Sequence, residues 1–378
     1  MRPIYIDITD FIRNPIRTGI QRIVREVLKC WPSTLPFVTV IFDSGRKALR
    51  SIAREAVDFA IKYSNKDNYT LHEAVEEIRF LADSARNFEI NISTGDRVLI
   101  PELFFDEDRI ECYRIALNNG VSVSFVVPDF LVWLRTETFP KGTTTSPLMP
   151  YLQLIIDSPR RAFISAAVKR SFEQRILRRE TGSSGIALDL GADGLNIPKQ
   201  KFRTSRNDLL FLGTLDGRKG QDVVYDAFCA RKQPSNLTLT FIGKVPHDYH
   251  PCLQRLLDSG RPDVKIITDA TDDDVAAHFH SVRASVYTSV AEGYGLPPME
   301  SLYAGVPVIV HQNLPALEGK PTDGQLRLAG SHHPETIRDA IEQVADDRLA
   351  RELWAGAARY PSVTWKSMTK TLVDWVLA

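Results

Sequence analysis

Cysteine is scarce in this sequence. The chain has 378 residues and four cysteines, widely spaced and without a CxxC pair: Cys30, Cys112, Cys229 and Cys252. A sequence with so few and so scattered cysteines is not a disulfide scaffold. We therefore expect reduced structural thiols in a cytoplasmic protein.

An excess of charge of one sign is also missing. Lys plus Arg and Asp plus Glu are equal in number, 47 each. No overall positive field attracts nucleic acid, and any basic surface must be local. We therefore expect no nucleic-acid partner.

Long hydrophobic runs are absent as well. No apolar run approaches the roughly 20 residues needed to cross a bilayer. The first eight residues read as a short strand followed by charges, without the apolar core of a signal peptide. The sequence predicts a soluble protein, with peripheral contact at the inner face of the membrane as a further possibility. There is no low-complexity tract and no repeat of fixed period.

The length and composition that are present favour two globular domains. Apolar residues make up 43% of the chain and charged residues 25%, which is ordinary for a globular protein. In the second half, short apolar strands alternate with helical stretches. The predicted strands are 209–212, 237–242, 264–268, 285–288 and 306–310. This alternation predicts βαβ units, a parallel sheet and an α/β Rossmann-like domain.

One stretch between the last two of these strands has unusual chemistry. It reads Glu292-Gly-Tyr-Gly-Leu-Pro-Pro-Met-Glu300, so two carboxylates lie eight positions apart with glycines and prolines between them. Because proline favours the first helical position, we expect a helix to begin near Pro297 or Pro298, with Glu300 in its first turn. Glu292 then lies at the carboxyl end of a strand, where open α/β sheets bind ligands. The amides of Gly295 and Leu296 could face an anion there. The alternative is a glycine turn with two solvated glutamates.

This string resembles the paired-glutamate signature of the retaining glycosyltransferases of the GT-B class, family four. The resemblance runs from about Gly213 to His311, with weaker similarity across residues 1–200. It implies two Rossmann-like domains that face a cleft. We expect an acceptor-binding domain at residues 1–200, a nucleotide-sugar-binding domain at 201–355 and a final helix at 356–378 that packs back on the first domain. It also implies that Glu292 binds hydroxyls of the donor sugar and Glu300 the ribose.

A second loop follows the strand 209–212 and is rich in glycine and cations. It reads Gly213-Thr-Leu-Asp-Gly-Arg-Lys-Gly220 and matches neither GxGxxG nor a Walker loop. Arg218 and Lys219 could stabilise the charge that builds on a leaving diphosphate, and the resemblance implies this role. The alternative is two exposed cations in a turn. The expected donor-binding residues are Gly213, Thr214, Gly243, Lys244, Tyr294, Gly295, Leu296 and Glu300.

The first half offers two candidate sites. The string Thr18-Gly19-Ile-Gln-Arg22 opens a predicted helix and resembles the amino end of bacterial transferases that build surface polysaccharides. It is a candidate acceptor or phosphate loop, or else a helix start with solvated arginines. Asp129 matches the second member of a His-Asp pair that the family places near the donor sugar, while Pro128 stands where the His is often found. Asp129 is therefore a candidate catalytic residue, or a loop Asp that caps a helix.

Two further segments carry predictions that a structure can test. Residues 46–63 have apolar side chains at helical spacing and predict one helix. The acidic run Asp272-Asp273-Asp274 follows Thr271, a pattern that favours a capping box over a metal site. The resemblance likewise implies a reaction without metal, and we expect no cofactor.

The sequence thus predicts a retaining, metal-independent glycosyltransferase. The donor is a nucleotide sugar, with GDP-mannose as the first choice and dTDP-rhamnose or a UDP-sugar as alternatives. The acceptor is a glycan or a lipid-linked molecule in polysaccharide or O-antigen synthesis. A nucleotide-sugar epimerase and a non-catalytic nucleotide-sugar-binding protein are the alternatives of other classes.

Overall fold

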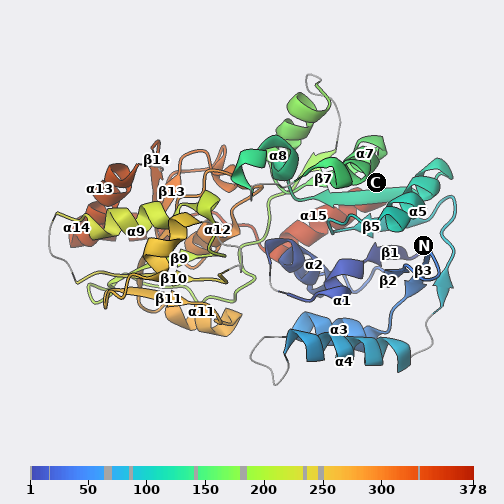
Figure 1. Ribbon diagram of the computed structural model, residues 1–378, viewed down its shortest axis with the longest axis horizontal. Helices are drawn as coiled ribbons and strands as arrows, with labels where there is room; N and C mark the ends of the chain where they lie inside the picture. Colours follow the sequence, from blue (N-terminus) through green and yellow to red (C-terminus); the bar gives the residue numbers. More distant parts are fainter. Residues whose placement is uncertain are drawn as a thin grey trace. The chain divides into compact units, whose positions relative to one another are not determined.

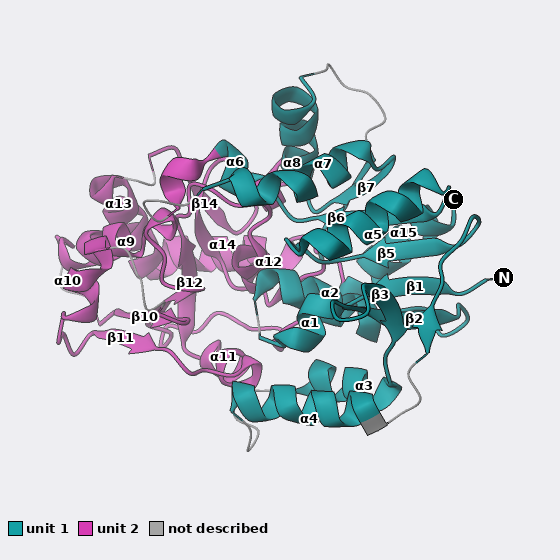
Figure 2. Cartoon of the chain, turned by 45° about the vertical axis from the view of Figure 1, so that its right-hand side comes forward, with its two compact units in different colours: residues 1–134, 142–190, 365–378 teal, residues 135–141, 191–364 magenta. Residues whose placement is uncertain are grey.

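The chain folds into two compact units, each with its own sheet (Figure 2). The computed structural model describes residues 2–16, 18–63, 70–84, 88–139, 144–178, 185–232, 236–245, 251–330 and 333–378. Unit 1 comprises residues 1–134, 142–190 and 365–378, and unit 2 comprises residues 135–141 and 191–364.

Unit 1 contains an eight-stranded sheet in the order β4-β3-β2-β1-β5-β6-β7-β8. Six of these strands are parallel to one another: β1 (Ile4–Asp7), β2 (Phe37–Asp43), β5 (Arg97–Ile100), β6 (Ser122–Val127), β7 (Arg160–Phe163) and β8 (Ile186–Ala187). An antiparallel edge is added by β3 (Ala48–Ser51) and β4 (Glu89–Ile90). The sheet is therefore parallel except at this edge.

The helices of unit 1 connect these strands and cover the sheet (Figure 1). They are α1 (Thr9–Arg13), α2 (Gly19–Lys29), α3 (Arg54–Lys62), α4 (Leu71–Ser84), α5 (Glu107–Asn118), α6 (Leu131–Leu134), α7 (Met149–Asp157) and α8 (Ala166–Ser171), with a π-helical turn at Phe172–Ile176. The last helix, α15 (Trp365–Leu377), also belongs to this unit and contacts α2.

The single helix predicted over residues 46–63 is wrong. The first part of this segment is β3, which forms a hairpin with β2, and only the second part is helix α3. The Asp43 carboxylate fixes the turn by accepting hydrogen bonds from the amides of Gly45 and Arg46 at 3.0 and 3.1 Å. Over so short a segment, the few apolar residues do not distinguish helical spacing from strand alternation, so only the long-range pairing with β2 decides between them.

Unit 2 is an all-parallel sheet in the order β11-β10-β9-β12-β13-β14. The strands are β9 (Asp208–Leu212), β10 (Thr238–Ile242), β11 (Val264–Ile267), β12 (Val282–Tyr287), β13 (Val308–His311) and β14 (Gln325–Leu328). The helices are α9 (Gln221–Cys229), α10 (Gln254–Leu257), α11 (Asp272–His278), α12 (Leu296–Tyr303), α13 (Pro334–Ala345) and α14 (Asp347–Arg359). In order of sequence the strands run 3-2-1-4-5-6, which is the order of a dinucleotide-binding Rossmann sheet. The predicted Rossmann-like domain is confirmed, and β14 adds a strand that the sequence pattern did not indicate.

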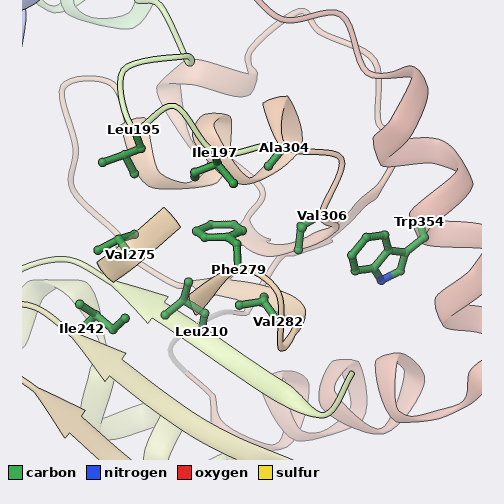
Figure 3. Packing of buried hydrophobic residues seen from close by; sticks show 10 residues of the cluster. All are labelled: Leu195, Ile197, Leu210, Ile242, Val275, Phe279, Val282, Ala304, Val306 and Trp354. Atoms are coloured by element: carbon green, nitrogen blue, oxygen red, sulfur yellow. The ribbon is translucent and has the colours of Figure 1, made fainter. Parts of the chain in front are cut away.

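A buried apolar cluster packs against the sheet of unit 2 (Figure 3). Phe279 lies at its centre, with Leu195 and Ile197 on one side and Leu210 and Val282 on the other. Leu195 and Ile197 thus belong to the core of the second unit, although they precede its first strand. For this reason the main segment of unit 2 begins at residue 191, whereas the sequence places the boundary at residue 200.

Across the described residues, no helix combines the length and the apolar character that crossing a membrane requires.

Candidate active site

The topology of unit 2 brings two loops into contact. β9 and β12 are neighbours in the sheet, so the loops at their carboxyl ends, 213–220 and 288–295, meet at the same edge. The amide of Val290 donates a hydrogen bond to the carbonyl of Arg218 at 3.3 Å, and the hydroxyl of Thr288 donates to the carbonyl of Lys219 at 3.1 Å. The strand order reverses at this point, and open α/β sheets bind ligands where it does so. Both motifs that the sequence singled out therefore lie at the switch point of the sheet.

Glu292 is held in place by its neighbours. Its Oε1 accepts hydrogen bonds from the Tyr287 hydroxyl and the Ser289 hydroxyl, each at 2.8 Å, and from Arg218 Nη1 at 3.3 Å. The side chains of Glu292 and Arg218 are mostly buried, with 15% and 19% of their surface exposed. A carboxylate held in this way has one defined orientation.

Arg218 is bound on several sides by the protein itself. Its Nε donates to Asp216 Oδ2 at 2.9 Å, and its Nη1 also donates to the carbonyl of Ala291 at 2.7 Å. Asp216 in turn caps the short turn Gly217–Lys219 by accepting from the amide of Arg218 at 3.1 Å. Arg218 therefore links the loop after β9 to the loop after β12.

Lys219 is in a different environment. Its ammonium group lies over the end of β9, where a Cβ added to Gly213 would be 3.0 Å from Nζ. The side chain is half-buried, and the described part of the chain provides no hydrogen bond or ion pair to Nζ. Burial lowers the pKa of Lys219 from its ordinary value, and the Glu292 carboxylate opposes that effect. A cation of this kind is suited to an anionic ligand.

The start of α12 carries four of the expected donor-binding residues. Gly295 is the residue before the helix and has φ of 103°, and a Cβ there would lie 2.8 Å from the side chain of Leu314. Tyr294 and Leu296 beside it are buried. The helix begins at Leu296, slightly earlier than predicted, so Glu300 lies beyond the first turn and is fully buried. The prediction that Glu300 belongs to the first turn is therefore wrong.

The remaining expected donor-binding residues lie at the ends of β9 and β10. A Cβ on Gly243 would come within 2.1 Å of the carbonyl oxygen of Gly213, so the absence of a side chain allows these strand ends to approach. Thr214 and Lys244 are exposed beside them, and the carbonyl of Lys244 accepts from the amide of Leu215 at 2.9 Å. These residues therefore line the same edge of the sheet as Lys219.

The candidates of the first half all belong to unit 1. Asp129 follows β6, and its Oδ1 accepts from the amide of Leu131 at 2.9 Å, which caps α6. Thr18 caps α2 by accepting from the amide of Gln21 at 3.4 Å, and Gly19 and Arg22 occupy the first turn of that helix. Asp129 thus makes the helix-capping contact that the sequence offered as an alternative, and the Thr18 string forms a helix start as predicted.

The acidic run in unit 2 forms a helix cap. Thr271 and Asp274 make the predicted capping box, with the Thr271 amide donating to Asp274 Oδ2 at 2.9 Å and the Asp274 amide donating to Thr271 Oγ1 at 3.2 Å. Throughout the residues that the structure describes, no group of three or more His, Cys, Asp and Glu side chains has the arrangement of a metal site.

Comparison with known proteins classifies the second unit. Residues 194–360 match the family model described as glycosyl transferases group 1. This segment, which lies within unit 2, is therefore similar to the group 1 glycosyl transferases. The matched segment contains both loops at the switch point, together with α12.

The chain is also similar to curated glycosyltransferases, at low sequence identity. The chain is 24% identical to the serotype-specific mannosyltransferase WbdA of Escherichia coli, over 98% of this chain and 46% of that protein. It is 27% identical to the D-inositol 3-phosphate glycosyltransferase of Paenarthrobacter aurescens, over 46% of this chain and 45% of that protein. Each alignment spans about half the length of the curated relative.

Solved structures share the fold of the whole chain. Sucrose-phosphate synthase of Thermosynechococcus elongatus superposes with a TM-score of 0.70 at 13% identity, over 99% of this chain and 98% of that one. Anabaena HepE in complex with UDP and glucose gives a TM-score of 0.66 at 13% identity, over 100% of both chains. These structural neighbours show that the chain has the GT-B fold, with two Rossmann-like units.

Sequence reasoning missed the residues that hold Glu292. Tyr287 is the last residue of β12 and Ser289 comes two positions later, so the extended chain projects both to one side. Their hydroxyls converge on the carboxylate that follows them. Polar residues at alternate positions at the end of an apolar strand are the signal that could have found them.

Proposed function

We propose that this chain is a retaining glycosyltransferase that moves a hexose from a nucleoside diphosphate sugar to an acceptor hydroxyl without a metal ion. The observation that carries the proposal is the contact between the two loops at the switch point. It brings the Lys219 ammonium, for which the described residues offer no partner, close enough to Glu292 for the carboxylate to affect its pKa. A nucleoside diphosphate sugar fits such a pair, because its diphosphate is an anion for Lys219 and its sugar hydroxyls are hydrogen-bond donors for Glu292.

The chemistry follows from the charges. The bond between sugar C1 and the phosphate oxygen breaks, and C1 forms a bond to the acceptor oxygen on the same face. The electron pair remains on the diphosphate, which takes the acceptor's proton. Lys219, with Arg218 beside it, supplies positive charge where this negative charge develops. Glu292 accepts hydrogen bonds from the sugar, and we assign Glu300 to the ribose and Asp129 to the sugar.

GDP-mannose is the donor that we propose, with UDP-sugars and dTDP-rhamnose as alternatives. Similarity to a mannosyltransferase along nearly the whole chain supports mannose. A structural neighbour that holds UDP and glucose supports testing UDP. We propose that the acceptor is a glycan or lipid-linked and is bound by unit 1, where Thr18, Gly19 and Arg22 form the candidate loop.

We also propose a cytoplasmic location at the inner membrane surface. None of the four cysteines forms a disulfide in the structure, as is usual in a reducing compartment. A lipid-linked acceptor would bring the enzyme to the membrane surface without a spanning segment.

The first test is thermal unfolding of the full chain with GDP, UDP, dTDP or ADP and no added metal. A nucleotide at a hundred times its Kd should stabilise the protein by about 2.7 kcal/mol. We expect one of the four to raise the melting temperature clearly more than the others. If none does, the proposal loses its nucleotide site.

The second test is product analysis with the nucleotide sugar that corresponds to the nucleotide that binds. We expect transfer to an added acceptor, and Glu292→Ala should lose most of it while melting normally. Glu352→Ala, which removes an exposed carboxylate of α14, is the matched control and should keep its rate. Conversion of the sugar without acceptor would show an epimerase, and binding without turnover over many acceptors would show a binding protein.

A further inference from the structure

The Glu292 carboxylate is engaged asymmetrically by the protein. All three of its hydrogen bonds, from Tyr287, Ser289 and Arg218, reach Oε1. Among the described residues, no donor to Oε2 is found. One oxygen is therefore saturated by the protein and the other is available to a ligand. Because an ionised carboxylate only accepts hydrogen bonds, the group that binds Oε2 must be a donor such as a hydroxyl.

The two hydroxyl donors are rigidly placed. Tyr287 is 3% exposed, and its ring packs against that of Phe211 with centroids 5.6 Å apart. Burial, reinforced by Glu292, raises the pKa of Tyr287 well above its ordinary value. The phenol therefore keeps its proton and donates a hydrogen bond to Glu292. Ser289 is 2% exposed, and its hydroxyl is closer to Glu292 than to the carbonyl of Ala291, at 2.8 against 3.4 Å. Neither side chain can swing away without leaving the core.

The third donor, Arg218, is also fixed by the protein. Asp216 and the carbonyl of Ala291 hold its guanidinium at 2.9 and 2.7 Å and turn Nη1 toward Glu292. Lys219 has no comparable contacts among the described residues. The two adjacent cations therefore differ in what they face: Arg218 faces protein acceptors, and Lys219 faces the end of β9, where we propose that the donor binds.

We infer that Tyr287, Ser289 and Arg218 are positioning residues, which hold Glu292 by Oε1 so that Oε2 accepts hydrogen bonds from sugar hydroxyls of the donor. The inference rests on the proposed function and refines it. Lys219 provides the direct contact to the diphosphate, whereas Arg218 acts mainly through Glu292.

A double-mutant cycle tests this division. Tyr287→Phe and Ser289→Ala are each made in the natural chain and in Glu292→Ala. Product is measured over long incubations so that residual rates are seen, with GDP-mannose and UDP-glucose run in parallel. In the natural chain each change should lower kcat/KM for the donor about ten- to hundredfold, as expected when a hydrogen bond to a charged group is lost. In Glu292→Ala the same changes should lower it less than twofold further.

Nucleotide binding separates positioning from phosphate contact. GDP and UDP lack the sugar, so Tyr287→Phe, Ser289→Ala and Arg218→Met should leave the Kd for the nucleotide that binds within about threefold. Lys219→Met should weaken it more than tenfold. Calorimetric titration provides these values, and melting temperatures show whether each variant is folded.

The matched control is Tyr303→Phe, because this hydroxyl, at the last residue of α12, has no hydrogen bond with the described residues. It should leave both kcat/KM and Kd unchanged. Equal losses from Tyr287→Phe with and without Glu292 would overturn the inference, as would an Arg218→Met variant that loses nucleotide binding as severely as Lys219→Met. The proposed function fails separately if no nucleotide binds or if Glu292→Ala keeps full activity, and the inference then falls with it.

Discussion

Arg218 and Lys219 are adjacent in sequence, yet their side chains have different surroundings in the structure. Both lie in the short 3-10 turn Gly217–Lys219, in which successive side chains point about 120° apart. Arg218 is thereby directed to Asp216 and Glu292, while Lys219 is directed over the end of β9. Two cations that form one motif in the sequence therefore face different groups in the structure, because the 3-10 turn directs their side chains apart.

A second charged cluster lies in the core of unit 1. The Arg109 side chain is fully buried and binds three carboxylates: Asp7 and Glu102 at 2.9 Å and Asp10 at 2.6 Å. Glu102 also accepts from the amides of Asp10 and Phe11 at 2.9 and 2.6 Å, so it fixes the start of α1. The carboxylates outnumber the cation, which makes this cluster sensitive to pH.

Glu102 should give the stability of unit 1 a measurable pH dependence. Burial raises its pKa from 4.5 to about 7, helped by Asp7 and Asp10, although Arg109 opposes this rise. An acid with a raised pKa holds its proton better in the folded state, so the folded state loses stability as pH increases through this range. The unfolding free energy should fall by up to about 3 kcal/mol between pH 4.5 and 7 because of this residue.

The measurement is urea unfolding of the natural chain and of Glu102→Gln at several pH values. Glu102→Gln should remove this part of the slope, whatever its effect on absolute stability. Glu107→Gln, at an exposed position in the first turn of α5, is the control and should leave the slope unchanged. Parallel pH profiles for the natural chain and Glu102→Gln would contradict the prediction.

At the scale of elements, the start of α12 depends on one glycine. Gly295 combines a left-handed backbone, with φ of 103°, and close contact with Leu314. Gly319 has a similar left-handed backbone, with φ of 66°, but nothing within 4 Å of an added Cβ. Comparing an alanine substitution at these two positions therefore separates the cost of the left-handed backbone from the cost of the clash with Leu314.

Gly295→Ala should destabilise unit 2 more than Gly319→Ala. A left-handed backbone costs a residue with a side chain about 1–3 kcal/mol, and overpacking adds about 1–3 kcal/mol at Gly295 alone. Chemical denaturation of both variants provides the comparison. Gly295→Ala should also weaken nucleotide binding, because the loop that carries Glu292 leads into this turn. Equal stability losses at the two positions would show that Leu314 moves aside without cost.

At the scale of the whole molecule, unit 1 is discontinuous in sequence. Its last helix, α15, follows the entire second unit along the chain. The apolar face of this helix is buried, and its members are Trp365, Met368, Leu372, Val373 and Val376. The carbonyl of Leu377 also accepts a hydrogen bond from Arg97 at 3.3 Å. The fold of unit 1 is thus completed only when residues 365–378 are present.

A chain that ends at residue 364 should therefore retain a folded unit 2 and lose unit 1. Each large apolar side chain contributes about 1.5–3 kcal/mol when buried, so five of them contribute roughly 10 kcal/mol, close to the whole stability of a domain. Hydrogen exchange read by mass spectrometry should show unprotected amides in β1, β5 and β6 and protected amides in β9 and β12. The control is the full chain with the exposed residues Lys366 and Lys370 changed to Ala, which should behave as the natural chain does. Protected amides in both units of the shortened chain would contradict the prediction.

Local features of this protein could be predicted from its sequence. The alternation of apolar strands and helices predicted the parallel sheet of unit 2, and the Thr271–Asp274 spacing predicted a helix cap. It also predicted that the Lys219 and Glu292 loops follow strands, because turn residues mark strand ends. Each of these depends on residues within a few positions of one another. The identities of catalytic and donor-binding residues remain predictions.

Which distant segments meet depends on the assembled fold. Strand order makes β9 and β12 neighbours, and this placement brings Arg218 to Glu292. Pairing with β2 made residues 48–51 a strand rather than part of a helix, and packing placed Leu195 in the core of unit 2. The physical reason is that these arrangements are stabilised by burial and hydrogen bonds between residues far apart in the chain. A local pattern fixes which face of an element is apolar, but several partners could cover that face, and only the assembled fold selects one.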